Sequence, residues 1–244
     1  MQAVIPAAGE GTRLRPLTED RPKGLVEAAD TPLLTRCFEE LLAVGVEEFV
    51  VVVEEFVVVV GYRKEEILGY YGDEFGGVPI TYVHQREQLG LAHAVGRAGS
   101  AIEDDFVLLN GDNVFRANLG EAVERQRRQS VDAVLVVEEV PEEQARRTGV
   151  VETDDSGRVT GLVEKPDDPP STLVTTGCYV LPTEVFHACE LLCPSARGEY
   201  ELPDAIDLLL AAGMTVETVR LDGWRVNVNA PADLERAERR LDGE

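Results

Sequence analysis

The residues with the clearest chemical potential form a glycine-rich loop near the start of the chain. The loop follows the apolar run Ala3-Val4-Ile5, which predicts a first buried strand. Gly9 and Gly11 let backbone N–H groups approach an anion, and Arg13 and Lys23 add positive charge beside them. The loop lacks the Gly-Lys-Ser/Thr of a Walker loop and the third glycine of a dinucleotide fingerprint. It therefore predicts a site for a polyphosphate.

A carboxylate follows another buried strand. The apolar run Phe106–Leu109 leads into Asn110-Gly111-Asp112. In a parallel sheet, ligands bind at the carboxyl ends of the strands, where this loop and the glycine-rich loop both lie. Mg²⁺ prefers hard oxygen ligands and keeps several waters, so one or two carboxylates with phosphate oxygens can hold it. Asp112 is therefore a predicted magnesium ligand, and the alternative is an aspartate that only caps its turn.

The composition restricts the partners of the protein. The 244 residues carry a net charge of −23, which argues against nucleic acid or an anionic membrane surface as a partner. Only three residues are lysines, Lys23, Lys64 and Lys165. A lysine-poor acidic surface is typical of adaptation to high salt, where a Debye length of about 3 Å at 1 M screens carboxylate repulsion. With no leader or membrane span expected, we predict a cytoplasmic protein, either halophilic or simply acidic.

Alternating strand and helix signals surround the two loops. Helical spacing is predicted over residues 33–43, 64–71, 91–101, 119–129, 182–192, 202–211 and 231–241. Strand signals lie at residues 3–5, in a valine-rich run after residue 45, and at 80–83, 106–109 and 133–137. This rhythm predicts an α/β fold, Rossmann-like and doubly wound, with a mostly parallel sheet. No linker divides the chain, so we expect a single domain over residues 1–244.

The pattern changes from Gly149 onward. Short strand signals at 150–152 and 159–163 flank the turn Asp155-Ser156-Gly157, which predicts a hairpin. We therefore expect a small β-rich subregion beside the main sheet. Nearer the end of the chain, Asn229-Ala230-Pro231 is typical of a helix start with proline in the first turn.

A perfect tandem repeat interrupts the first half. Residues 47–53 read EEFVVVV, and residues 54–60 repeat the same seven letters. Strands usually run three to ten residues, and an odd repeat reverses the inward face if the strand simply continues. We therefore predict that one copy fills a sheet position and that the other is an inserted duplication without a catalytic role.

Five separated segments together resemble the sugar-1-phosphate nucleotidyltransferases. They are residues 8–18 with Pro22-Lys23, residues 85–94, residues 110–113, residues 163–166, and residues 175–179 with 197–201 downstream. The resemblance covers nearly the whole chain in the expected order. It is strongest to glucose-1-phosphate thymidylyl- and uridylyltransferases, and the acidic composition points to the haloarchaeal uridylyltransferases among them.

The resemblance implies a reaction and a residue set. UTP or dTTP would condense with a sugar 1-phosphate, glucose 1-phosphate above all, to give an NDP-sugar and pyrophosphate. Nucleotide-binding residues would be Ala8, Gly9, Gly11, Thr12, Arg13, Gln85 and Gly90, and sugar-phosphate-binding residues Gly149, Glu164, Lys165, Thr176 and Gly177. The catalytic residues would be Arg13, Lys23 and Asp112. Residues 1–140 would form the nucleotide-binding half and 141–244 the sugar-phosphate-binding half, in a chain compatible with a homo-oligomer.

One position departs from the family pattern. The family usually has an aspartate after a C-terminal tryptophan as a second magnesium ligand, and here Asn227 stands there after Trp224. An amide oxygen can bind Mg²⁺ without supplying negative charge, so the implied metal ligands are Asp112 and Asn227. This change is the one feature favouring a catalytically weak or inactive sugar-nucleotide-binding regulatory protein. A molybdopterin guanylyltransferase-like enzyme shares the glycine loop but gives no reason for Glu164-Lys165-Pro166.

Overall fold

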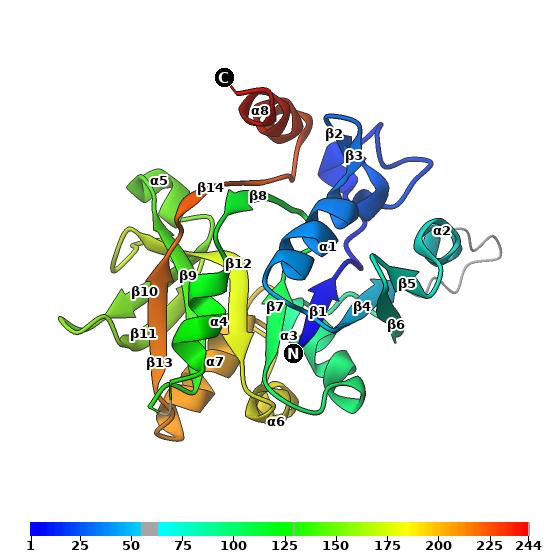
Figure 1. Ribbon diagram of the computed structural model, residues 1–244. Coiled ribbons are helices and arrows are strands. Elements are labelled where there is room, and N and C mark those ends of the chain that lie inside the picture. Colours follow the sequence, from blue (N-terminus) through cyan, green and yellow to red (C-terminus); the bar gives the residue numbers. More distant parts are fainter. Residues whose placement is uncertain (55–62, 129, 244) are drawn as a thin grey trace.

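The computed structural model describes residues 1–54, 63–128 and 130–243, and its centre is a parallel sheet (Figure 1). Strand β1 (Gln2–Pro6) pairs in parallel with β4 (Glu48–Glu54) on one side and β7 (Phe106–Leu109) on the other. Beyond β4 lies β6 (Val78–Gln85), also parallel. These strands read as apolar runs because helices cover both of their faces.

The two faces of the sheet carry separate apolar layers. Ile5 and Val51 pack with Phe38 of α1 (Leu33–Ala43), whereas Val4 and Val50 pack with α3 (Leu91–Ala98) on the opposite side. Successive strand side chains point to opposite faces, so each strand contributes to both layers. This confirms the predicted doubly wound α/β architecture.

Antiparallel strands extend the sheet from β7. Strand β12 (Leu173–Leu181) pairs with β7, with β9 (Ala133–Glu139) and with β10 (Gly149–Thr153). Its register against β9 shifts between Thr175 and Tyr179. The predicted hairpin is present, formed by β10 and β11 (Val159–Glu164), and β13 (Val216–Arg220) pairs in parallel with β9.

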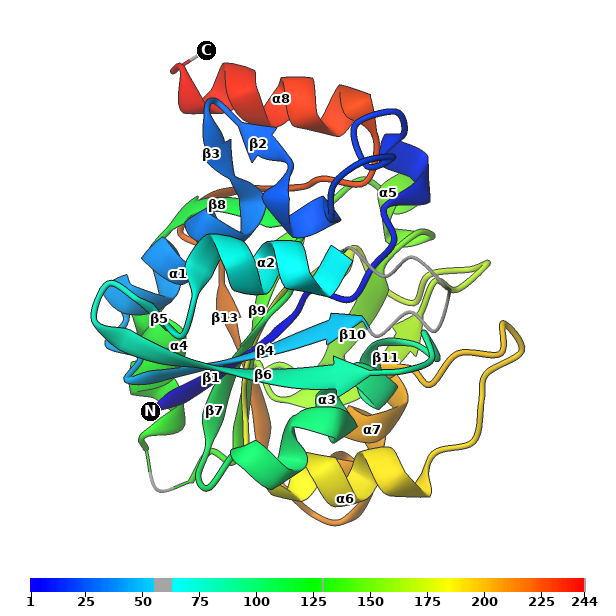
Figure 2. The same cartoon turned by 90° about the vertical axis from the view of Figure 1, so that its right-hand side faces the viewer.

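A two-stranded ribbon brings a late segment of the chain to the loop after β7. Strand β8 (Asn113–Ala117) pairs with β14 (Gly223–Asn227), which places Asn113 opposite Asn227. The N–H of Val228 donates to the carbonyl oxygen of Asp112 at 2.8 Å. Helix α8 (Pro231–Leu241) follows and lies across β2 (Glu27–Ala28) and β3 (Thr31–Pro32) (Figure 2).

The remaining elements surround this frame. The helices are α2 (Arg63–Tyr71), α4 (Gly120–Gln126), α5 (Glu142–Ala145), α6 (Glu184–Leu191) and α7 (Leu202–Ala211). The 3₁₀ turns are Thr12–Leu14, Lys23–Leu25 and Gly99–Ala101, and the short strand β5 is Glu74–Phe75. No helix in the described ranges has the length and apolar character to cross a membrane.

The first copy of the repeat forms β4, and Phe49 and Val50 to Val53 are fully buried in it. This confirms that one copy fills the sheet position. The second copy, residues 54–60, lies outside the described residues except for Glu54, which ends β4.

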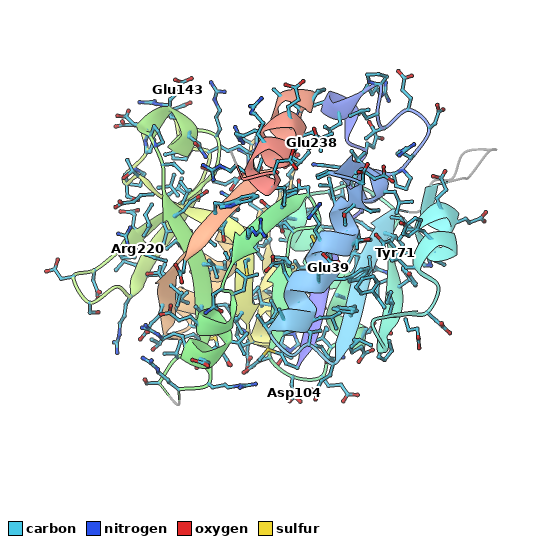
Figure 3. The ribbon with its side chains drawn as sticks, turned by 45° about the horizontal axis from the view of Figure 1, so that its top comes forward. Glu39, Tyr71, Asp104, Glu143, Arg220 and Glu238 are labelled. Atoms are coloured by element: carbon cyan, nitrogen blue, oxygen red, sulfur yellow. The ribbon has the colours of Figure 1, made fainter. Side chains whose placement is uncertain are left out.

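Acidic side chains spread over separate parts of the surface. Glu39 on α1, Asp104 before β7 and Glu143 on α5 are exposed and stand well apart (Figure 3).

Candidate active site

Two cavities meet at the carboxyl end of the parallel strands. The first, of about 320 Å³, is lined by residues 6–9, Lys23, Gly24, Gln85, Gln88, Gly90, Leu91, Ala94, residues 110–112 and Glu199. The second, also about 320 Å³, draws on Arg13, Glu164, Lys165, Thr175 to Gly177, Arg225, Asn227, Asn229 and others. Both are lined by Leu91, Asn110, Asp112 and Glu199, so two ligands could touch beside Asp112.

Lys23 and Asp112 form an ion pair at this junction. Lys23 lies in a 3₁₀ turn that begins after Pro22, and its Nζ is 2.8 Å from Oδ2 of Asp112. The Lys23 side chain is 11% exposed and that of Asp112 29%; Lys23 lines the first cavity, and Asp112 lines both. Nζ also donates to Oδ1 of Asn229 at 3.1 Å.

The two glycines of the loop have different surroundings. A Cβ on Gly9 would meet nothing within 4 Å, so its open face lies toward the first cavity, which Ala8 also lines. Gly11 has φ +63°, and a Cβ there would lie 2.9 Å from Thr18 Cγ2 and 3.2 Å from Lys23 Cβ. Gly11 therefore allows Lys23 to pack closely, and neither Gly11 nor Thr12 is among the described lining residues.

The amides of this loop remain available to a ligand. No described residue accepts a hydrogen bond from the backbone N–H of Gly9, Gly11 or Thr12. Successive free N–H groups in a turn make a concave anion site.

Gln85 is held with a fixed amide orientation. Its Nε2 donates to Nδ1 of His93 at 2.8 Å and more weakly to the carbonyl oxygen of Gly90 at 3.5 Å. Burial lowers the pKa of His93, which favours the neutral ring whose Nδ1 can accept this bond. With Nε2 engaged, and with no described donor to Oε1, Gln85 offers an acceptor at the edge of the first cavity.

Position 90 requires a glycine because the backbone of Tyr200 approaches it closely. It has φ +104°, and a Cβ there would lie 2.6 Å from the carbonyl oxygen of Tyr200. The Tyr200 backbone bonds to Leu89 at 2.7 Å and to Ala92 at 3.0 Å, which docks the 199–200 segment onto the start of α3. Gln88, which sequence reasoning missed, donates to the carbonyl oxygen of Ala8 at 2.6 Å and closes the same cavity.

Glu164 and Lys165 lie at the end of β11 in the second cavity. Glu164 Oε1 is 3.0 Å from Lys165 Nζ and 3.7 Å from Arg197 Nη2, so its carboxylate lies near two cations. Gly149 makes room for it, because a Cβ there would lie 3.1 Å from Glu164 Oε2. Lys165 adopts φ +48°, a conformation that non-glycine residues rarely hold outside functional or strained sites.

A bulge in β12 lines the second cavity with residues Thr175 to Gly177. Thr176 Oγ1 donates to the carbonyl oxygen of Val136 at 2.8 Å, so it is the backbone of Thr176 that is left for a ligand. Gly177 has φ +81°, and its carbonyl oxygen accepts from the N–H of Asn110 at 2.8 Å. A Cβ on Gly177 would lie 2.8 Å from Asn110 Nδ2 and 2.9 Å from Asn113 Nδ2.

We expect Gly177→Ala to reduce stability and to weaken sugar-phosphate binding. The left-handed backbone alone costs about 1–2 kcal/mol for alanine, and the methyl group must also displace two asparagine amides. Urea unfolding and the KM for the sugar phosphate measure the two effects. Gly157→Ala is the matched control, because Gly157 has φ +83° with open space around its Cβ position. Equal losses of stability in the two variants would show that the asparagine contacts add nothing.

Arg225 organises the asparagine beside the ion pair, and sequence reasoning missed it. Its side chain is 5% exposed and pairs with Glu138 at 2.8 Å. It also donates to Asn113 Oδ1 at 3.0 Å and to the Thr175 carbonyl oxygen at 3.2 Å. Because Arg225 holds the amide oxygen of Asn113, the amide nitrogen Nδ2 faces Asp112 and donates to its Oδ1 at 3.3 Å.

The donor set at the junction fits magnesium. Asp112 and Asn227 both line the second cavity and offer carboxylate and amide oxygens, the hard ligands that Mg²⁺ prefers. Asn227 Oδ1 accepts one bond, from Asn229 Nδ2 at 2.7 Å, and retains a second lone pair. Asn229 was expected only to start a helix, yet it contacts Asn227, Lys23 and Arg13.

Comparisons with known proteins show which family the chain belongs to. The chain matches the nucleotidyl transferase family over residues 2–236. It is 53% identical to the UTP–glucose-1-phosphate uridylyltransferase of Haloferax volcanii, covering 100% of this chain and 98% of that protein. A glucose-1-phosphate thymidylyltransferase of Streptomyces griseus is 36% identical, over 100% of this chain and 69% of that protein.

The fold comparison gives the same result. The UTP-bound UGPase of Acinetobacter baumannii has a TM-score of 0.82 and 27% identity, over 98% of this chain and 92% of that one. Sequence and structure together therefore show that the chain belongs to the nucleotidyl transferase family.

Proposed function

We propose that this protein condenses UTP or dTTP with glucose 1-phosphate to give the NDP-glucose and pyrophosphate. The observation that carries the proposal is the meeting of two cavities at the Lys23–Asp112 ion pair, with nucleotide-type features in one and sugar-type features in the other. The activities named for the Haloferax and Streptomyces relatives support it.

The chemistry needs no protein nucleophile. A phosphate oxygen of the sugar 1-phosphate forms a bond to the α-phosphorus of the triphosphate, the bond from that phosphorus to the α,β-bridging oxygen breaks, and pyrophosphate leaves with its electron pair. Catalysis then rests on positioning and on stabilising phosphoryl charge. Lys23 lies where the two cavities meet, so its ammonium can neutralise oxygens at the reacting centre. The free loop amides would serve the departing pyrophosphate, and Arg13, which lines the second cavity, would add positive charge beside them.

Magnesium is part of the proposal as a cofactor. Asp112 and Asn227 would hold it, and when bound it would supply positive charge to the phosphate oxygens. Asp112 would have to exchange part of its contact with Lys23 for the metal.

The first cavity favours uracil or thymine. Gln85 Oε1 is an acceptor, and no described residue accepts from the N–H of Gly90, which is a donor close by in sequence and space. Uracil and thymine offer the complementary pattern, an N3–H donor beside carbonyl oxygens. Cytosine presents an unprotonated N3 and would leave the Gln85 oxygen facing another acceptor.

The second cavity suits a neutral sugar with a phosphate. Glu164 can accept from sugar hydroxyls, and its carboxylate oxygen Oε1 lies 3.0 Å from Lys165 Nζ and 3.7 Å from Arg197 Nη2. Lys165 can then contact the sugar phosphate. Backbone groups of Thr176 and Gly177 complete the wall.

Pyrophosphate release tests the function directly. Wild-type protein is incubated with Mg²⁺, each of the common nucleoside triphosphates and a panel of hexose 1-phosphates, across a range of KCl concentrations. We expect the highest kcat/KM with UTP or dTTP and glucose 1-phosphate, no release in EDTA, and activity maintained at molar salt, as the acidic surface of a halophilic cytoplasmic enzyme suggests. Tight nucleotide binding without turnover in any combination would instead support the regulatory alternative.

We expect Asn227→Asp to lower the Mg²⁺ concentration that gives half-maximal rate. Aspartate keeps the acceptor for Asn229 Nδ2 and adds a negative charge at a proposed ligand position. A Mg²⁺ titration of pyrophosphate release measures the change. Asn118→Asp adds the same charge at an exposed position before α4 and serves as the control. If both variants titrate like the wild type, Asn227 is not a ligand.

A further inference from the structure

Asn229 has an unusually constrained place between β14 and α8. Its backbone N–H donates to Asp233 Oδ2 at 3.1 Å, and the N–H of Ala230 donates to the same oxygen at 2.9 Å. The preceding residue, Val228, is bonded to the Asp112 carbonyl oxygen at 2.8 Å. The backbone at 229 is thus fixed on both sides, to the first turn of a helix and to the loop after β7.

The side chain of Asn229 joins three site residues at once. Its Oδ1 accepts from Lys23 Nζ at 3.1 Å and from Arg13 Nη2 at 3.1 Å. Its Nδ2 donates to Asn227 Oδ1 at 2.7 Å. Lysine and arginine are donors only, so the amide oxygen must face them, and the amide nitrogen must then face Asn227.

This arrangement determines the orientation of a second amide. Because Asn229 presents N–H groups to Asn227, the Asn227 amide must turn its oxygen toward Asn229 and into the second cavity. That oxygen is the atom a hard cation requires. An aspartate at 229 could still accept from Lys23 and Arg13, but it could not donate to Asn227.

We propose that Asn229 is a positioning residue that holds Arg13 and Lys23 together and fixes the Asn227 amide with its oxygen available to the metal. The inference rests on the proposed function and adds a role that neither cation nor Asn227 can supply alone. Arg13 is exposed, and Asn229 is the one hydrogen-bond acceptor that the described residues give it. Lys23 is held from two sides, by Asp112 and by Asn229.

Two substitutions separate the two roles. Asn229→Asp preserves size and the acceptor for the cations, but it forces the Asn227 amide to turn its nitrogen toward the new carboxylate. Asn229→Ala removes the acceptor for the cations and leaves Asn227 free to turn either way. Thermal unfolding of both variants checks that the fold is retained, and Asn118→Asp repeats the charge change away from the site.

Binding is measured without turnover. Electron paramagnetic resonance of Mn²⁺ in the presence of UTP gives metal affinity, and calorimetry in EDTA gives UTP affinity. For Asn229→Asp we expect Mn²⁺ to bind about tenfold more weakly, although the added negative charge by itself would strengthen it. For Asn229→Ala we expect UTP to bind about tenfold more weakly in EDTA, with KM raised more than kcat is lowered.

Opposite results overturn the inference. Unchanged or tighter Mn²⁺ binding in Asn229→Asp would show that Asn229 does not orient Asn227. A UTP affinity within twofold of the wild type in Asn229→Ala would show that it does not hold the cations. Failure of the proposed function looks different, because wild-type protein would then bind no UTP or release no pyrophosphate, whatever the behaviour of the variants.

Discussion

Asp112→Ala is expected to lower the rate of pyrophosphate release by about 10³-fold, the largest single-residue effect in the protein. Asp112 lines both cavities, and it accepts from Lys23 through one oxygen and from Asn113 through the other. Removing the carboxylate takes away the anionic ligand proposed for the metal and leaves the Lys23 ammonium without its ion-pair partner. The reacting centre then loses both its charge balance and its geometry.

The fold should survive this change. The contact that docks the segment after β14 uses the backbone carbonyl of Asp112, not its side chain. We therefore expect the variant to unfold at a temperature close to that of the wild type. Steady-state rates of pyrophosphate release at saturating Mg²⁺ measure the loss of activity. Asp104→Ala, at an exposed position before β7, is the control for loss of one carboxylate (Figure 3). A wild-type rate in Asp112→Ala would remove Asp112 from the metal site and return it to the role of a turn cap.

Lys23→Met is expected to have the second-largest effect and to lower kcat by about 10²–10³-fold. Methionine has nearly the length of lysine, so the packing on Gly11 is kept while the ammonium is removed. The Asp112 carboxylate then lacks the cation 2.8 Å away, and the phosphates lack a charge at the junction of the two cavities. Most of the loss should appear in kcat, since the charge matters most where phosphoryl charge develops.

Pre-steady-state rates with UTP and glucose 1-phosphate show whether the loss in kcat of Lys23→Met comes from the chemical step or from slower product release. Arg128→Met, at an exposed position after α4, controls for the loss of one positive charge from an acidic protein. If the chemical step in Lys23→Met proceeds at the wild-type rate, Lys23 serves only the stability of the loop.

Local signals were sufficient for much of the fold. Helices at 33–43, 202–211 and 231–241 begin and end where the apolar period and the flanking proline or glycine predict. Strand β12 was missed because Thr175-Thr176-Gly177 breaks its alternation, and the break is the bulge where the strand changes partners. Its pairing depends on strands far away in sequence, which no local window contains.

The candidate site shows the same division. Lys23 and Asp112 were predicted one at a time, from a glycine loop and a buried strand. Asn229 was not, because a single asparagine before a proline reads as a helix start. Its partners Lys23 and Arg13 lie 206 and 216 residues away in sequence, so only the folded chain reveals the contact.

The ribbon of β8 and β14 has a consequence for the order in which the protein matures. A ribosome releases the chain from its N-terminus, and domains begin to fold during synthesis. Strands β1, β4, β6 and β7 can therefore pair, and Lys23 can meet Asp112, before β14 has been translated. Asn227 and Asn229 arrive only with this last ribbon. If Asn227 and Asn229 have the roles proposed for them, a nascent chain can form most of the first cavity early, and turnover is the last property that it acquires.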